Sequence, residues 1–283
     1  MNEILVAIGG GLMAGKTLEN LLGPTTEYLG EGMLKLVKKR VENLQHIFAS
    51  AEAKLGDRIN SPGAVPPRVL AGVLNDGSYR EDPIAIEYFG GVLASSRTEI
   101  SRDDRSATFV SLVSRLSTYQ LRLHYILYAS FLKLYGGSGA SVALEHERTL
   151  LTTFIPESEI NVAMDFAETE KRATVIVHAL LGLARESLIG PTYGVGDADA
   201  TRSLGYTGTE RGLVIHPSPF GVELFLFAMG GGHLPINIFL RPEITFGSME
   251  GVTIPAGCLA LKKPTAEARQ IDASTLNVPP SNA

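Results

Sequence analysis

The longest regular pattern in this sequence is a run of apolar residues with helical spacing between Thr25 and Leu55. Successive apolar positions are three or four residues apart: Leu29, Met33, Val37, Val41, Leu44, Phe48, Ala51 and Leu55. Residues at these intervals lie on one face of a helix, so the run predicts a single long amphipathic helix, which Gly56 and Asp57 end. The run therefore favours a helical N-terminal region.

The other face of this predicted helix is basic. It carries Lys35, Lys38, Lys39 and Arg40, with Glu42 among them. A charged cluster of this kind is typical of a solvated helix face, which is the interpretation we favour. A face that binds a partner or a phosphate is the alternative.

Helix-start signals recur along the following part of the chain. Asp82 is a predicted N-cap with Pro83 at the first helical position. Ser117 and Gln120 form a capping-box pattern at the start of another helix. A further long helix is predicted from Glu170 to Leu188, because its apolar residues again recur with helical spacing. These signals extend the helical prediction over about two thirds of the sequence.

The pattern changes towards the C-terminus. Residues 212–217 (GLVIHP) predict a short strand, and the apolar helix after it begins at Ser218 and Pro219. After Gly230–Gly232 come four short β-like runs separated by proline and glycine: INIFL, EITF, GVTIP and CLALK. Polar residues with prolines follow from Pro264 and are typical of a mobile tail.

Together these patterns predict an α+β fold that is predominantly α-helical. We expect a helical N-terminal region at 1–100 and a winged-helix-like domain with long insertions at 101–232. A small β-rich segment is expected at 233–263, and a flexible tail at 264–283.

The winged-helix expectation rests on the order of elements in the second region. A helix pair over 107–135 and a helix over 170–188 precede a strand, a turn and a terminal helix. A DNA-binding winged helix needs a basic recognition helix. The candidate helix has Lys171, Arg172 and Arg185 only near its ends. We therefore favour a packing or dimerisation module, and a DNA-binding regulator is the alternative.

Composition sets the remaining limits. The 283 residues carry a formal net charge of -5, which gives no bias towards nucleic acid or anionic membranes. The single cysteine, Cys258, excludes an internal disulfide and a cysteine-based metal site. The N-terminal apolar run Ile4–Ile8 is short and preceded by Glu3 rather than by basic residues, so no secretory signal is predicted. A cytoplasmic protein is the expectation.

Residues 10–17 match the phosphate-binding loop signature G-x-x-x-x-G-K-T. The match supplies Gly10, Gly15, Lys16 and Thr17 as candidate nucleotide-binding residues. A phosphate-binding loop joins a strand of a parallel sheet to the N-terminus of a helix.

The surrounding sequence does not provide this context. The helix after Thr17 spans only about six residues before Gly23 and Pro24 end it. No second strand follows for some hundred residues, and no apolar run ends in an aspartate for magnesium. We therefore favour a short helix that opens at Gly15–Thr17, with Lys16 in solvent beside the long helix.

The other polar clusters are weak candidates. Asp103 and Asp104 lie next to Arg105 in the segment SRDDRS, which favours a salt-linked loop over an acidic metal site. The six histidines form no zinc-binding pattern, and His124 is predicted to be a core or interface residue rather than a catalyst. No catalytic residue, metal site or cofactor is predicted, so an enzyme is the less favoured class.

Residues 14–135 resemble a known family in the order and spacing of their elements. The segments are AGKTLENLLGPTTEYLGE, IFASAEAKLGD, PPRVLAGVLNDGSYREDP, EYFGGVLASS and FVSLVSRLSTYQLRLHYILY. They look like the bacterial abortive-infection alpha (Abi-alpha) family, and GLVIHPSPFGVELFLFAM extends the resemblance to about residue 230. The resemblance implies a role in phage defence, and it implies that the G-K-T stretch belongs to an N-terminal helix. It brings no catalytic residues.

The resulting functional hypothesis is a non-enzymatic, cytoplasmic antiphage-defence protein. It would act by binding a protein partner, a phage component or itself. One alternative is a membrane-active effector that exposes Ile4–Met13 and Val222–Leu240 on activation. A P-loop nucleotide hydrolase and a DNA-binding regulator are the other two alternatives.

Overall fold

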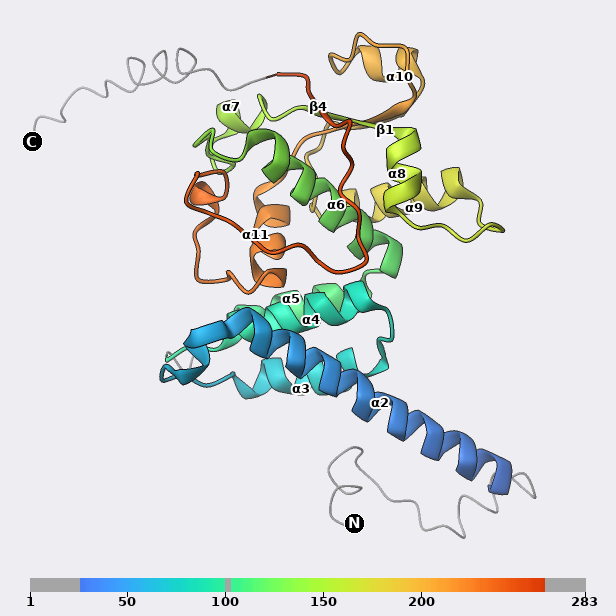
Figure 1. The fold of residues 1–283 in the computed structure, drawn as a ribbon, viewed down its shortest axis with the longest axis vertical. Helices are drawn as coiled ribbons and strands as arrows, with labels where there is room; N and C mark the ends of the chain where they lie inside the picture. The colour runs from blue at the N-terminus through green and yellow to red at the C-terminus, as the bar shows by residue number, and fades with distance from the viewer. Residues whose placement is uncertain (1–25, 100–102, 263–283) are drawn as a thin grey trace, which may run out of the picture.

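The computed structural model describes residues 26–99 and 103–262, which form an α+β structure dominated by helices (Figure 1). The predicted tail at 264–283 lies outside these residues. Helices α2 to α5 pack together at the N-terminal end. Later helices pack on the other side of α4 and α5, and the small sheet lies beyond them (Figure 1).

The N-terminal helices centre on α4 (Pro83–Ser96), whose side chains are almost all buried. Around it pack α2 (Thr26–Leu55), α3 (Pro67–Asn75) and α5 (Ser106–Arg115), with the short 3-10 helices η2 (Gly56–Asn60) and η3 (Gly77–Tyr79) between them. The predicted cap of α4 is confirmed, because the Asp82 carboxylate accepts a hydrogen bond from the Ile84 N–H at 3.0 Å.

Helix α4 also contacts the C-terminal part of the chain. It packs against α11 (Pro219–Ala228), and a Cβ atom at Gly91 would lie only 1.7 Å from the Ala228 carbonyl oxygen. Only glycine permits this close approach of the two backbones. The main core cluster accordingly includes residues from α2 through to Cys258, on both sides of the boundary predicted near residue 100.

The side of α2 that faces the core differs from the predicted apolar face. Asn43, Ile47 and Ser50 are buried against the neighbouring elements, whereas Val41 and Phe48 are 42% and 41% exposed. Small residues set this orientation, because a Cβ at Gly90 would lie 2.5 Å from the Ser50 hydroxyl oxygen. The close contact with α4 turns part of the apolar stripe of α2 towards solvent.

The second half of the structure is built on α6 (Thr118–Tyr135). Its predicted capping box is confirmed: the Gln120 N–H donates to the Ser117 hydroxyl, and the Ser117 N–H donates to the Gln120 side chain. The elements after α6 are α7 (Glu145–Arg148), β1 (Thr153–Pro156), α8 (Glu157–Ala163), α9 (Arg172–Arg185), β2 (Gly194–Gly196), α10 (Ala198–Arg202), β3 (Gly212–Ile215), α11, η4 (Ile236–Ile238) and β4 (Leu259–Ala260).

The four strands form one antiparallel sheet in the order β2-β3-β1-β4. In its register Phe154 lies opposite Val214, and Val195 lies opposite Leu213. β4 pairs with β1 on the other edge. Both β1 and β3 are fully buried, so the sheet is a structural core element of this half.

The prediction of a β-rich segment at 233–263 is wrong for the residues described. Between 233 and 262 the chain contains η4 and the two-residue strand β4, and the EITF and GVTIP runs form no strand. The segment instead packs along α6 by separate contacts: the Leu240 carbonyl accepts from Gly137 and Gly139, and the Met249 N–H donates to Tyr125. The prolines and glycines between the apolar runs disfavour paired strands and favour an irregular segment, which we call the strap (residues 233–262).

Candidate functional site

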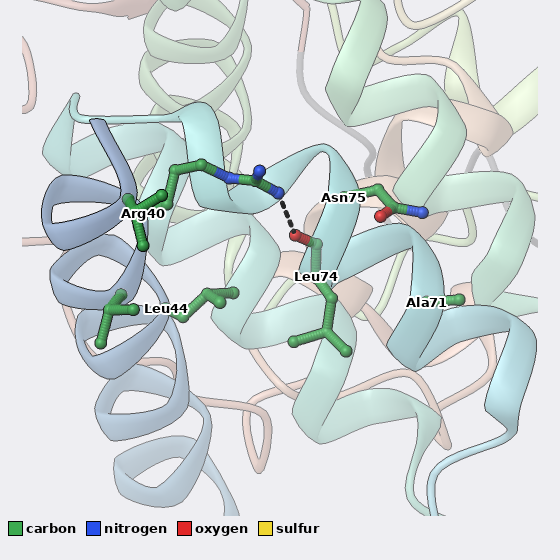
Figure 2. A pocket seen from close by; sticks show the side chains of 7 residues that line it. Arg40, Leu44, Ala71, Leu74 and Asn75 are labelled. Atoms are coloured by element: carbon green, nitrogen blue, oxygen red, sulfur yellow. Dashed lines mark hydrogen bonds between the residues drawn. The ribbon is translucent and has the colours of Figure 1, made fainter. Parts of the chain in front are cut away.

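An apolar groove lies between α2 and α3 (Figure 2). Both helices pack on α4 and on η3, and the space between them has a volume of about 380 Å³. It is lined by Val37, Arg40, Val41 and Leu44 from α2 and by Ala71, Leu74 and Asn75 from α3. Among the described residues, this helix-lined groove is open at the surface.

The apolar wall of the groove belongs to a longer stripe on α2. It comprises Leu34, Val37, Val41, Leu44 and Phe48, at alternating intervals of three and four residues. This spacing is typical of a seam that packs against another helix. The stripe covers about 21 Å of helix at 1.5 Å per residue. Leu34 is 56% exposed, so much of the seam has no packing partner among the described residues.

The inner edge of the groove is fixed by Arg40. Its guanidinium donates to the Ser78 hydroxyl at 2.9 Å and to the Leu74 carbonyl at 3.4 Å, the second bond being visible in Figure 2. The same group lies 4.2 Å from the ring centre of Tyr79. A cation suits this position because the last carbonyls of α3 carry partial negative charge. Arg40 thus holds α2 at a set distance from α3.

The rest of the predicted basic face is in solvent. Lys39 lies 3.9 Å from both Glu42 and Glu81. Lys35 and Lys38 are exposed and form no ion pair within the part of the chain that the structure describes. The structure therefore divides the predicted cluster into a bridging arginine, one lysine paired with carboxylates and two lysines open to solvent.

The candidate polar cluster is a set of surface ion pairs. Arg105 donates to both carboxylate oxygens of Asp103, at 2.8 and 2.9 Å, and this hydrogen bonding lowers the pKa of Asp103. Asp104 pairs with Arg68 at 3.2 Å. The two carboxylates are thus held by different arginines, as the salt-linked interpretation expects. Within 26–99 and 103–262 no cluster of three histidine, cysteine or acidic side chains is placed to hold a metal ion.

The predicted phosphate-binding loop and the two apolar segments differ in how much of them the structure describes. Gly10, Gly15, Lys16 and Thr17 lie outside the described residues, as does Ile4–Met13, so these interpretations stay predictions. Most of the apolar stretch Val222–Leu240 is internal: Val222, Leu224–Ala228, Phe239 and Leu240 are buried in the core. None of the described helices combines the length and apolar character needed to cross a membrane.

His124 is a core residue, as predicted. Its Nε2 lies 3.1 Å from the Gly221 carbonyl oxygen and its Nδ1 lies 2.6 Å from the Tyr88 hydroxyl. Because a carbonyl can only accept, Nε2 carries the proton and Nδ1 accepts from Tyr88. Burial lowers the pKa of His124 to about 3, so the ring is neutral and joins α4, α6 and α11.

A second exposed apolar surface lies on α9. Val177 and Leu181 project from this helix, with Val162 of α8 and Val195 of β2 also exposed. A small hollow of about 130 Å³ lies between α8, α9 and the β2–β3 pair.

The α2–α3 groove was not identified from the sequence. The alternating spacing of the α2 stripe could have indicated the α2 wall of the groove. The α3 wall could not be predicted, because it depends on how both helices pack on α4. Leu74 is 37% exposed and lies at the end of α3, where no local pattern distinguishes it from a core residue.

Comparison of this chain with family models, curated proteins and solved structures finds no match in any of the three. The resemblance to the Abi-alpha family stays a prediction drawn from the sequence segments.

Proposed function

We propose that this chain is a non-enzymatic component of bacterial antiphage defence, of the abortive-infection type, that acts by binding a protein partner. The observation that carries the binding role is the open α2–α3 groove with its exposed apolar seam. Contiguous exposed apolar surface is typical of interaction sites in globular proteins. The defence context comes from the resemblance of residues 14–230 to the Abi-alpha family.

The region from 101 to 232 is, in this proposal, a winged-helix-like module that serves packing rather than DNA recognition. Support for this comes from the element order α6-α7-β1-α8-α9-β2-α10-β3 and from the pairing of β3 with both β1 and β2. The exposed side of α9 carries Val177 and Leu181 between its terminal arginines. An apolar surface of this kind suits contact with protein better than contact with a phosphate backbone.

Phage plating tests the proposal directly. The full chain is expressed in a bacterial host, which is then challenged with a panel of phages. We expect reduced plating with the natural sequence and restored plating with Val41→Asp, which places a carboxylate in the apolar groove. Leu144→Asp is the matched control: this residue is 46% exposed and directly precedes α7, a helix that lies far from α2 and α3 in Figure 1.

Either of two outcomes refutes the proposal. The defence role fails if the natural chain lowers plating of no phage in the panel. The groove fails as the binding site if Val41→Asp protects as well as the natural sequence while both proteins are present at equal levels.

A further inference from the structure

We propose that the occupant of the α2–α3 groove is an amphipathic helix of another protein, with acidic residues beside its apolar stripe. This inference rests on the proposed function and adds the chemistry of the partner to it. Three features of the groove lead to it: its shape, the charge beside it and the poor fit of a second copy.

The shape of the groove fits a helix. Its two walls are helices that both rest on α4, and the spacing of Leu34, Val37, Val41, Leu44 and Phe48 is that of a helix-packing seam. A helix that docks in such a groove uses apolar residues at positions i, i+3 or i+4, and i+7. About four turns of helix cover the 21 Å of the seam.

The charge beside the seam is basic. At about 100° of rotation per residue, Lys38 lies next to Leu34 and Val41 on the outer edge of the seam, and Lys35 lies further round on the same side. Neither lysine has an ion-pair partner in the described part of the chain, whereas Lys39 is paired with Glu42 and Glu81. An acidic side chain on the docked helix would complement these two lysines.

A second copy of this chain fits the same surface poorly. In an antiparallel pairing of two α2 helices about a two-fold axis, the same edge of the seam meets in both copies. With Val37 over Val41 of the other copy, Lys38 then lies beside Lys38 of that copy. A parallel pairing places Lys38 on the same edge as Arg40 of the other copy. Like charges at such positions oppose association, so the basic rim favours a partner of opposite charge.

Binding of two designed peptides to the full-length protein tests this inference. Both peptides are about 18 residues long, with leucines at alternating three- and four-residue intervals. One has glutamates beside the leucine stripe and the other has lysines there. With fluorescein-labelled peptides, anisotropy titration should give at least about tenfold tighter binding for the glutamate peptide, and the difference should shrink as salt is added.

Three variants locate the interaction. Val41→Asp should abolish binding of both peptides, and Lys38→Glu should narrow or reverse the preference between them. Leu144→Asp should leave both affinities unchanged. Val41, Lys38 and Leu144 are all exposed, so the variants should fold, and circular dichroism checks that they do.

Several outcomes overturn the inference. They are equal affinity for the two peptides, no binding of either, and binding that Val41→Asp leaves unchanged. Displacement of the glutamate peptide by a synthetic peptide of residues 4–22 assigns the groove to this chain's own N-terminal segment instead. A dimer in sedimentation that Val41→Asp dissociates assigns it to a second copy.

These results are separable from the proposed function. If Val41→Asp removes phage protection but the peptides show no charge preference, the binding role stands and the partner chemistry fails. If Val41→Asp keeps full protection, the proposed function fails whatever the peptides do.

Discussion

Acidification should destabilise this protein through His124, and replacing that residue should remove the effect. In the folded state the ring is neutral, because burial lowers its pKa to about 3, while an unfolded histidine titrates near its ordinary value of 6.5. Between these two pKa values the unfolded chain binds more protons than the folded chain. The free energy of unfolding is therefore fully retained above pH 6.5 and falls as the pH is lowered towards 3.

The size of the effect follows from the two pKa values. Each pH unit below 6.5 removes about 1.4 kcal/mol of stability, so the contribution lost on going to pH 5 is about 2 kcal/mol. Burial also lowers the pKa values of His216 and His233, which are less buried and add to the same trend. The contribution of His124 to the pH dependence of stability is therefore measured as the difference between the natural protein and a His124 variant.

Urea unfolding of the natural protein and of His124→Gln at pH 7.5, 6 and 5 provides that difference. Far-ultraviolet circular dichroism is the suitable probe, since the sequence has no tryptophan. Glutamine keeps an N–H donor for the Gly221 carbonyl but does not titrate. The variant should be less stable at pH 7.5 and lose about 2 kcal/mol less than the natural protein on going to pH 5. His178→Gln is the surface control, and parallel pH profiles for the natural protein and His124→Gln would refute the reasoning.

Three further predictions concern packing, capping and the groove. Gly91→Ala should lower the free energy of unfolding by about 3 kcal/mol or more, because its Cβ would lie 1.7 Å from the Ala228 carbonyl oxygen; an unchanged melting temperature would contradict this contact. Ser117→Ala should cost about 1 kcal/mol in urea unfolding by removing the α6 cap, and a loss near zero would mean that the cap is redundant. Val41→Asp should change stability by less than about 0.5 kcal/mol, and a cooperative transition at lower urea would show that this side chain supports the core.

Local chemistry explains which parts of the fold could be predicted. Asp82 and Ser117 cap α4 and α6 as expected, because a cap depends on residues within one turn of the helix start. The burial of His124 could also be anticipated from the apolar residues on both sides of it.

The orientation of α2 could not be predicted in this way. The spacing of Val41 and Phe48 places them on an apolar face, yet the helix buries Ile47 and Ser50 instead. The choice depends on Gly90, a residue far along the chain that admits Ser50 at close range. Apolar periodicity identifies a helix face, but the packing partner decides how that face is turned.

The strap at 233–262 and the groove also depend on packing partners that the local sequence does not specify. Short apolar runs have high strand propensity, but a strand also needs a neighbour with free backbone groups, and this segment pairs with the sheet only at Leu259 and Ala260. The groove combines α2 with Leu74 of α3, which is 30 residues beyond Leu44 in the sequence. No local sequence pattern in either helix indicates that α2 and α3 line one groove.

The backbone contact between Gly91 and Ala228 also limits how the molecule can respond to a bound partner. At Gly91 the two helices meet through main-chain atoms with no side chain between them, so α4 and α11 should move as one rigid unit. Gly90 likewise brings α4 close to Ser50 and the Ile47 carbonyl of α2, so any adjustment of the groove to an incoming helix falls to α3 and to the exposed turns of α2 around Leu34 and Val41. Binding of a partner helix should therefore slow amide hydrogen exchange in α2 and α3, and it should leave the exchange rates of α4 and α11 unchanged.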